Sequence, residues 1–241
     1  MSNNRHNLIQ RISESNSRGL ASRREWKAFG RVQIFIKDPL PPDVDIQYII
    51  QELEKKIPLQ FVSDLDIIYI GQFDQLVQRG VEAVYEDGAI YVSNEQPTED
   101  EFVETIAHEI AHALEELVPM EIYADGAVEN EFLGKRVRLW AILRAEGYLY
   151  KDGGLEHFEN VAYTKEFDEF LYKDIGYPTL TSLTMGLFLS PYGATSLKEY
   201  FGNTFEAFFV NNEREYVKKI SPAVYNKLVE ISRDEENINV R

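Results

Sequence analysis

One helix with sharp boundaries constrains the fold of this chain more than any other segment. Thr98 is a favourable N-cap, Glu101 completes a capping box three residues later, and Pro119 ends the helix. At 100° per residue, the apolar side chains between these limits share one arc of about 140°. They are Phe102, Val103, Ile106, Ala107, Ile110, Ala113, Leu114 and Leu117. Such an arc must pack on a core, so we expect the helix to be a central element of a globular domain.

Strand patterns precede this helix and helical patterns follow it. Residues 31–37 alternate like a half-buried strand, residues 66–71 resemble a buried strand, and residues 81–92 predict a hairpin that turns at Asp87-Gly88. Helices are predicted for residues 44–57, 127–146, 161–173 and 197–210, and from Ser221-Pro222 to about residue 231. Because strands come early and helices late, the pattern favours an α+β fold with a small mixed sheet rather than a doubly wound one.

The chain is long enough for one large domain, preceded by a polar arm. Residues 1–27 contain five arginines in an otherwise acidic protein and have too little apolar area to fold alone. We expect this arm to be held by a partner chain through contacts between its arginines and an acidic surface. The domain is then expected to run from residue 28 to residue 241.

The composition excludes several classes of function. The 41 Asp and Glu residues exceed the 25 Lys and Arg residues, and the resulting net charge of −16 argues against nucleic acid or an anionic membrane as the main partner. No segment approaches the roughly 18 consecutive apolar residues of a membrane span, and none resembles a signal peptide. We therefore expect a location in the cytoplasm or within a larger assembly such as a virion. The absence of cysteine excludes a thiolate metal site and a cysteine nucleophile, so a metal must be held by His and carboxylate.

The central helix carries the sequence HExxH, with His108, Glu109 and His112. The two histidines are four residues apart, so they lie one turn above the other on the same side of the helix. Two imidazoles placed in this way can bind one Zn²⁺ ion. Glu109 points to a neighbouring side, where it can act as the general base of a metal-dependent hydrolase. The motif therefore predicts zinc-dependent hydrolysis of peptide bonds.

A third protein ligand is needed, and the spacing leaves several carboxylates open. The chain has Glu115 and Val118 where a metzincin would have Gly and His, so that class is excluded. The other histidines, His6 and His157, have no spacing that favours them. A glutamate is therefore expected, as in enzymes of the thermolysin type.

Two segments supply this glutamate. Glu129 and Glu131 follow His112 at 17 and 19 residues, which suits a ligand on the next helix. Glu199 and Glu206 lie in the later segment. The seven residues between these two span about 10.5 Å of helix on one face, so they do not both bind one ion. If Glu199 is the ligand, Glu206 is expected to support the site from outside the coordination sphere.

The later segment resembles the zinc peptidase domain of anthrax lethal factor and the related Pro-Pro endopeptidases. In that family a Tyr-Gly pair is followed, seven residues after the Tyr, by the ligand Glu and then by aromatic residues. This chain has Tyr192-Gly193, then Glu199, then Tyr200-Phe201. The resemblance implies a zincin-like fold, Glu199 as the third zinc ligand, and Tyr192 as a hydroxyl donor to the oxyanion.

From these observations we predict a zinc endopeptidase of the gluzincin type that acts on a peptide or protein substrate. A strand near residues 89–93 is expected to be the sheet edge that binds the substrate main chain. Asp125 is a candidate for orienting a ligand histidine, and the aromatic residues after Glu199 are expected to be core. The alternative is a structural or assembly component of a larger particle, viral or otherwise, that carries a retained or vestigial zincin domain.

Overall fold

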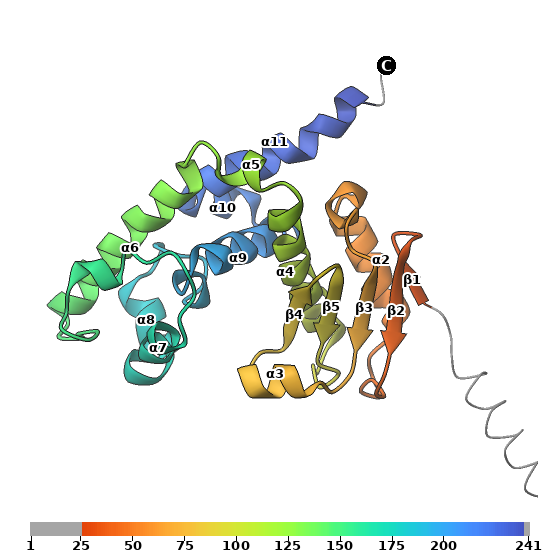
Figure 1. Cartoon of the computed structure of the whole chain (residues 1–241), viewed down its shortest axis with the longest axis horizontal. Helices are drawn as coiled ribbons and strands as arrows, with labels where there is room; N and C mark the ends of the chain where they lie inside the picture. Colours follow the sequence, from red (N-terminus) through yellow and green to blue (C-terminus); the bar gives the residue numbers. More distant parts are fainter. Residues whose placement is uncertain (1–25, 239–241) are drawn as a thin grey trace, which may run out of the picture.

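The computed structural model describes the backbone of residues 26–238 and the side chains of residues 26–233. Residues 1–25, and with them nearly all of the predicted arm, lie outside this range. The sheet has five strands in the order β1-β2-β3-β5-β4 (Figure 1). Their bounds are β1 Trp26–Ala28, β2 Val32–Ile36, β3 Ile67–Ile70, β4 Ala83–Glu86 and β5 Ala89–Val92. Because β1 pairs with β2, the sheet begins two residues before the predicted domain boundary at residue 28.

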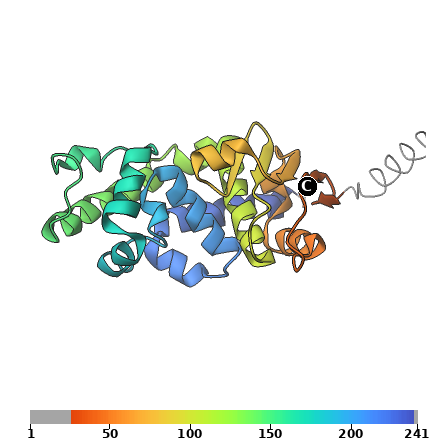
Figure 2. The ribbon, with the colours of Figure 1, turned by 90° about the horizontal axis from the view of Figure 1, so that it is seen from below.

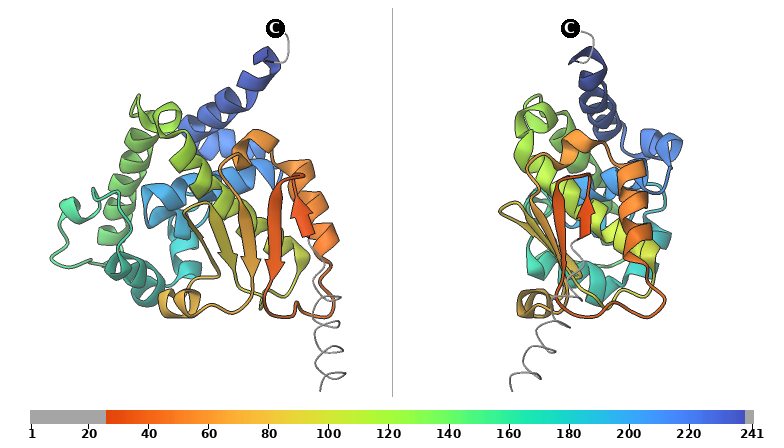
Figure 3. Two further views of the ribbon diagram at one scale, coloured as in Figure 1. Left: turned by 45° about the vertical axis from the view of Figure 1, so that its right-hand side comes forward. Right: turned by 90° about the vertical axis from the view of Figure 1, so that its right-hand side faces the viewer.

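The sheet is mixed. Strands β2, β3 and β5 run parallel to one another, whereas β1 and β4 lie antiparallel at the two edges. Helices α2 (Ile46–Lys56) and α4 (Glu99–Leu117) cover one face, and the other face is open in the views of Figure 3. The alternation in β2 explains this arrangement, because Val32 and Ile34 are buried under the helices while Phe35 is 42% exposed on the opposite face.

Most of the chain after α4 is helical. The bounds of these helices are α5 Pro119–Tyr123, α6 Ala127–Ala145, α7 Lys165–Glu169, α8 Tyr177–Leu183, α9 Leu197–Phe209, α10 Arg214–Ile220 and α11 Pro222–Ile238. Figure 2 shows the sheet toward one end of the molecule and α6, α7 and α8 toward the other, whereas α11 runs back toward the sheet. Shorter elements are α3 Asp74–Arg79, the 3-10 turns η1 Leu59–Val62, η2 Leu155–His157 and η4 Tyr192–Ala194, and the π-helical η3 Phe170–Ile175. The predicted α+β class is confirmed at this level.

The local signals for the central helix and the hairpin are confirmed. The Thr98 side chain accepts a hydrogen bond from the Glu101 backbone N–H, and α4 ends one residue before Val118. Asp87 and Gly88 both have positive φ angles, of 47° and 79°, as a tight hairpin turn requires.

The helix predicted for residues 161–173 is wrong at its start and in its geometry. Thr164 is the N-cap of α7, so the preceding residues are not helical, and the chain then changes to the π-helical η3 at Phe170. The last helix, α11, extends to Ile238 rather than ending near residue 231.

The predicted substrate-binding edge is also wrong. The strand expected at residues 89–93 is β5, which lies inside the sheet between β3 and β4. The edge beside α4 is β4, because β5 uses its second side to pair in parallel with β3. Among the helices within residues 26–238, none combines the length and the apolar character needed to cross a membrane.

Candidate metal centre

The candidate centre lies where α4 crosses α9. A glycine permits the close approach of the two helices, because a Cβ atom at Gly202 would lie 2.7 Å from His108 Cε1 and 2.8 Å from His108 Nε2. Gly202 is three residues after Glu199, so the residue that makes room for the imidazole is one turn from the carboxylate that the imidazole contacts. Ser196 begins α9 by accepting a hydrogen bond from the Glu199 backbone N–H.

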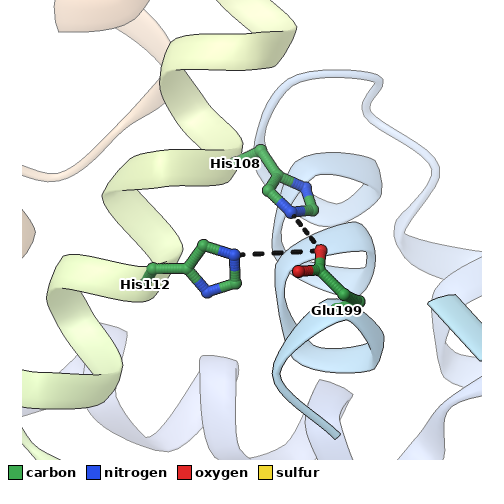
Figure 4. A group of neighbouring side chains, drawn as sticks. All are labelled: His108, His112 and Glu199. Atoms are coloured by element: carbon green, nitrogen blue, oxygen red, sulfur yellow. Dashed lines mark hydrogen bonds and ion pairs between the residues drawn. The ribbon is translucent and has the colours of Figure 1, made fainter. Parts of the chain in front are cut away.

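The structure brings His108, His112 and Glu199 together (Figure 4). Glu199 Oε2 lies 2.9 Å from His108 Nε2 and 3.9 Å from His112 Nε2. Two ligands of a tetrahedral zinc ion, each about 2.0–2.1 Å from the metal, lie about 3.3–3.4 Å apart. The observed distances lie on either side of that value. The three side chains are only 13–15% exposed, so the group is shielded but still reached by solvent.

Each histidine has a carboxylate on its other ring nitrogen. Glu206 Oε2 is 3.7 Å from His108 Nδ1, and Glu115 Oε2 is 2.9 Å from His112 Nδ1. Glu115 is 4% exposed and also accepts a hydrogen bond from the Tyr123 hydroxyl. Carboxylates in these positions orient a ligand imidazole and increase its basicity. The arrangement leaves both Nε2 atoms to face Glu199.

The pKa values reflect this crowding of charges. Burial alone would lower the pKa of His108, but the hydrogen bond to Glu199 and the ion pair with Glu206 reverse the effect and raise the pKa to about 10. Burial likewise opposes the shift at His112, where the hydrogen bond to Glu115 raises the pKa. Burial would raise the pKa of Glu199, but the hydrogen bond from His108 and the charge of His112 lower it. These shifts favour protonated imidazoles beside an ionised Glu199 carboxylate. A bound cation could take the place of the positive charge on the imidazoles.

Glu109 lies beside the metal group and contacts the edge strand. Its carboxylate accepts a hydrogen bond from the Tyr85 backbone N–H of β4, at 2.6 Å. The side chain is 8% exposed, and burial raises its pKa despite the opposing charges of His112 and His108. Glu109 is thus hydrogen-bonded to the edge of the sheet, whereas His108 and His112 face Glu199 on α9.

Tyr192 lies near the group in η4. Its ring centroid is 6.4 Å from that of His108, and its hydroxyl lies near enough to the Glu199 carboxylate to help lower the pKa of that group. Burial, together with the negative charge of Glu199, raises the pKa of Tyr192. Its phenol is therefore neutral and can donate a hydrogen bond at ordinary pH.

The other predicted ligands lie elsewhere. Glu131 accepts hydrogen bonds from the Tyr200 hydroxyl and the Ala223 backbone N–H, and Glu129 is exposed on α6. Asp125 pairs with Lys227 at 2.8 Å and caps Ala127, so its predicted role in orienting a ligand histidine is wrong. The aromatic residues of α9, from Tyr200 to Phe209, are buried as core, as expected.

A second group of acidic and histidine side chains occurs in the loop after α6. Asp152, Glu156 and His157 could approach one ion, but both acids are exposed. Asp152 Oδ1 is already occupied by the Gly154 backbone N–H and by His157 Nε2, at 3.0 and 2.8 Å. This group has the geometry of a turn capped by Asp152. His157 is therefore a partner of that turn, which agrees with the expectation that it is not a ligand of the HExxH zinc.

Sequence reasoning missed four contributors to the centre. Glu115 could have been found, because it follows His112 by three residues on the same helix. Gly202 carried a weaker signal as a glycine inside a helix. Tyr85 acts through its backbone, and no sequence pattern shows that.

Arg136 is the fourth, and it supports the segment that carries Tyr192. The side chain is 1% exposed and donates to the backbone carbonyls of Phe158, Asn160, Ala194 and Thr195. Its guanidinium also lies 3.9 Å from the centroid of the Phe167 ring. A buried arginine was not expected from sequence, since arginines are mostly exposed.

No protein-family model, no curated protein and no solved structure matches this chain. A proposal for the function of this protein therefore depends on the geometry of the centre.

Proposed function

We propose that this protein is a zinc-dependent endopeptidase whose zinc ligands are His108, His112 and Glu199. The observation that carries the proposal is the convergence of both HExxH imidazoles on one glutamate oxygen, at distances that suit a tetrahedral site. The protein offers two nitrogens and one oxygen, which is the donor set of a catalytic zinc site rather than a closed structural one. Outer carboxylates on both imidazoles are also typical of zinc sites.

A zinc ion held there would polarise the scissile carbonyl and lower the pKa of a water molecule to about 7. Glu109 is the proton carrier in this proposal. Its carboxylate is buried beside the group, and the raised pKa allows it to take a proton from the attacking water and deliver it to the leaving amine. The Tyr85 N–H fixes one carboxylate oxygen and leaves the other available for this exchange.

Tyr192 is proposed to donate its phenolic hydrogen to the oxygen that becomes negative as the peptide carbonyl is attacked. A neutral donor aimed at developing charge lowers the barrier more than it stabilises the substrate. Burial and the nearby Glu199 charge raise the pKa of Tyr192, so the phenol keeps its proton and can donate it to a hydrogen bond when the substrate arrives.

Strand β4 is proposed to bind the substrate main chain in an extended form. The Ser93 backbone N–H donates to the Glu82 carbonyl, which identifies the hydrogen-bonded pairs of the hairpin. The backbone N–H and C=O groups of Glu82, Val84 and Glu86 therefore point toward β5. The backbone groups of Ala83 and Tyr85 therefore point outward. The Tyr85 N–H is used by Glu109, which leaves the Ala83 N–H and C=O as the pair that a peptide can meet by strand addition.

Glu109→Gln tests the proposal. We expect the variant to keep about one zinc per chain and to lose hydrolysis of a denatured protein substrate such as casein, because Gln keeps the shape but cannot carry the proton. Zinc content is measured by elemental analysis and hydrolysis by peptide release. Retained hydrolysis, or loss of zinc from this variant, would contradict the assigned role.

We also propose that residues 1–27 dock a partner chain through their arginines, on the grounds of composition given above. Deleting residues 1–25 should leave the thermal stability of the domain nearly unchanged and weaken assembly, more so at high salt. Unfolding of the truncated protein would show that the arm belongs to the domain.

A further inference from the structure

A hollow lies at the far end of α9 from the metal centre. It has a volume of about 530 Å³ and is bounded by the end of α2, the start of η1, and helices α9, α10 and α11. Phe208 and Phe209, which line it, follow Glu199 by nine and ten residues, or about 13.5–15 Å along the helix. We call this hollow the α9–α11 groove. It shares no lining residue with the metal centre.

The floor of the α9–α11 groove is a connected set of aromatic rings. Phe208 packs against Phe209 at 4.7 Å and against Tyr225 at 5.5 Å between ring centroids, and Phe209 packs in turn on Phe61. At the rim, Leu59 is 56% exposed, which is high for a large aliphatic side chain. The floor is therefore apolar and closely packed, with an exposed aliphatic residue beside it.

Cations lie directly on this floor. The Arg214 guanidinium carbon is 4.5 Å from the Phe208 ring centroid, and Lys218 Nζ is 5.7 Å from that of Tyr225. Neither side chain makes an ion pair with any carboxylate that the structure describes. Stacking on a ring holds the guanidinium plane in place while its N–H edge stays available for a carboxylate.

Further basic residues complete the lining. Lys55, Lys56 and Arg233 line the groove, and among the side chains described, which end at Arg233, Glu54 is the only acidic one in the lining. The two lysines already pair with Glu52 at 2.9 and 3.4 Å, so Arg214 and Arg233 are the cations best able to meet a ligand. A basic lining is an exception on a chain of net charge −16, and it favours an acidic partner by charge complementarity.

We propose that the α9–α11 groove binds an acidic peptide segment of a partner protein, with an aromatic or aliphatic anchor on the ring floor and carboxylates on Arg214 and Arg233. A free phosphate ion has no apolar part to pack against the aromatic floor. The few cations around one small hollow do not form the extended basic surface that nucleic acid requires. An acidic peptide with an apolar anchor satisfies both parts of the groove.

Fluorescence anisotropy of the full chain with a labelled peptide tests this inference. The probe is fluorescein-EEFEELEE, and its comparison peptides are KKFKKLKK and EESEESEE, which remove the charge match and the anchors in turn. We expect the probe to bind at least tenfold more tightly than either comparison peptide, and to bind more weakly as salt rises.

The groove is identified with matched variants. Arg214→Glu combined with Arg233→Glu should weaken probe binding at least tenfold. Arg138→Glu combined with Lys165→Glu makes the same change in net charge at exposed positions outside the groove and should leave binding within twofold of the original. Circular dichroism confirms that both variants remain folded.

Three results would overturn the inference: no saturable probe binding, equal binding of the probe to both double variants, or groove-dependent binding of phosphatidylserine vesicles without binding of the probe. A fourth would reassign the groove to this chain's own end, namely probe binding that appears only after truncation at Arg233.

Discussion

The glycine between the two helices of the centre offers a strong test of the site, because the same substitution at a second helical glycine should leave zinc binding unchanged. Gly202→Ala places a methyl group against His108, whereas Gly134→Ala, in α6, places one where no atom lies within 4 Å. Both glycines lie inside helices and neither has a positive φ angle. The two variants therefore share the gain in helix propensity and differ in packing.

The magnitude follows from the contact distances. A new Cβ atom at Gly202 would be 2.7 Å from His108 Cε1, where ordinary contact begins near 3.4 Å, so the imidazole or α9 must move by about 0.7 Å. Metal–ligand distances tolerate only about 0.2 Å. Disturbing the support of a ligand histidine typically lowers metal affinity by about 10–100-fold, or about 1.4–2.7 kcal/mol.

Zinc affinity is measured by competition with a chromophoric chelator, and stability by urea unfolding without metal. We expect Gly202→Ala to bind zinc at least about tenfold more weakly. We expect Gly134→Ala to bind zinc normally and to gain about 0.5–1 kcal/mol of unfolding free energy, since alanine is the better helix former. Unchanged zinc affinity in Gly202→Ala would refute the close approach of His108 to α9.

The remaining predictions concern single side chains. Tyr192→Phe should keep zinc and fold but lower the turnover number by about 10²–10³, as measured with a fluorogenic peptide, because only the oxyanion donor is lost; unchanged turnover would remove Tyr192 from the mechanism. Glu199→Ala should abolish stoichiometric zinc binding in elemental analysis, whereas Glu206→Ala should weaken it without abolishing it, and the reverse order would exchange their roles. Arg136→Met should cost at least about 3 kcal/mol of unfolding free energy in urea, because the three buried carbonyls of Phe158, Ala194 and Thr195 lose their donor at about 1–3 kcal/mol each; a loss below about 1 kcal/mol would contradict this account.

The parts of the fold that could be predicted depend on local signals. Thr98, Glu101 and Pro119 define α4 through short-range capping and sterics, and Asp87-Gly88 defines the hairpin through backbone φ angles. The meeting of Glu199 with the HExxH pair was anticipated from a short spacing pattern and a resemblance. The placement of Glu206 outside it followed from helical rise once Glu199 was taken as the ligand.

The sequence predictions were wrong where the structure depends on strand pairing or packing between distant parts of the chain. Both strands of the hairpin are short and apolar, and only the parallel pairing of β5 with β3 makes β4 the edge. Asp125 was one candidate for an outer carboxylate, but Glu115, which lies one turn after His112 on α4, occupies that position. The change from α7 to the π-helical η3 depends on tertiary packing of Phe170 and Leu171, which are buried. No pattern in the segment reports this packing.

The most direct test of the central claim is an anomalous difference map, recorded at the zinc absorption edge, from crystals of the full chain supplied with one equivalent of zinc. The account predicts one peak about 2.0–2.2 Å from His108 Nε2, His112 Nε2 and a carboxylate oxygen of Glu199. A peak held by Glu129 or Glu131, a peak confined to the Asp152 loop, or no peak at all would contradict it.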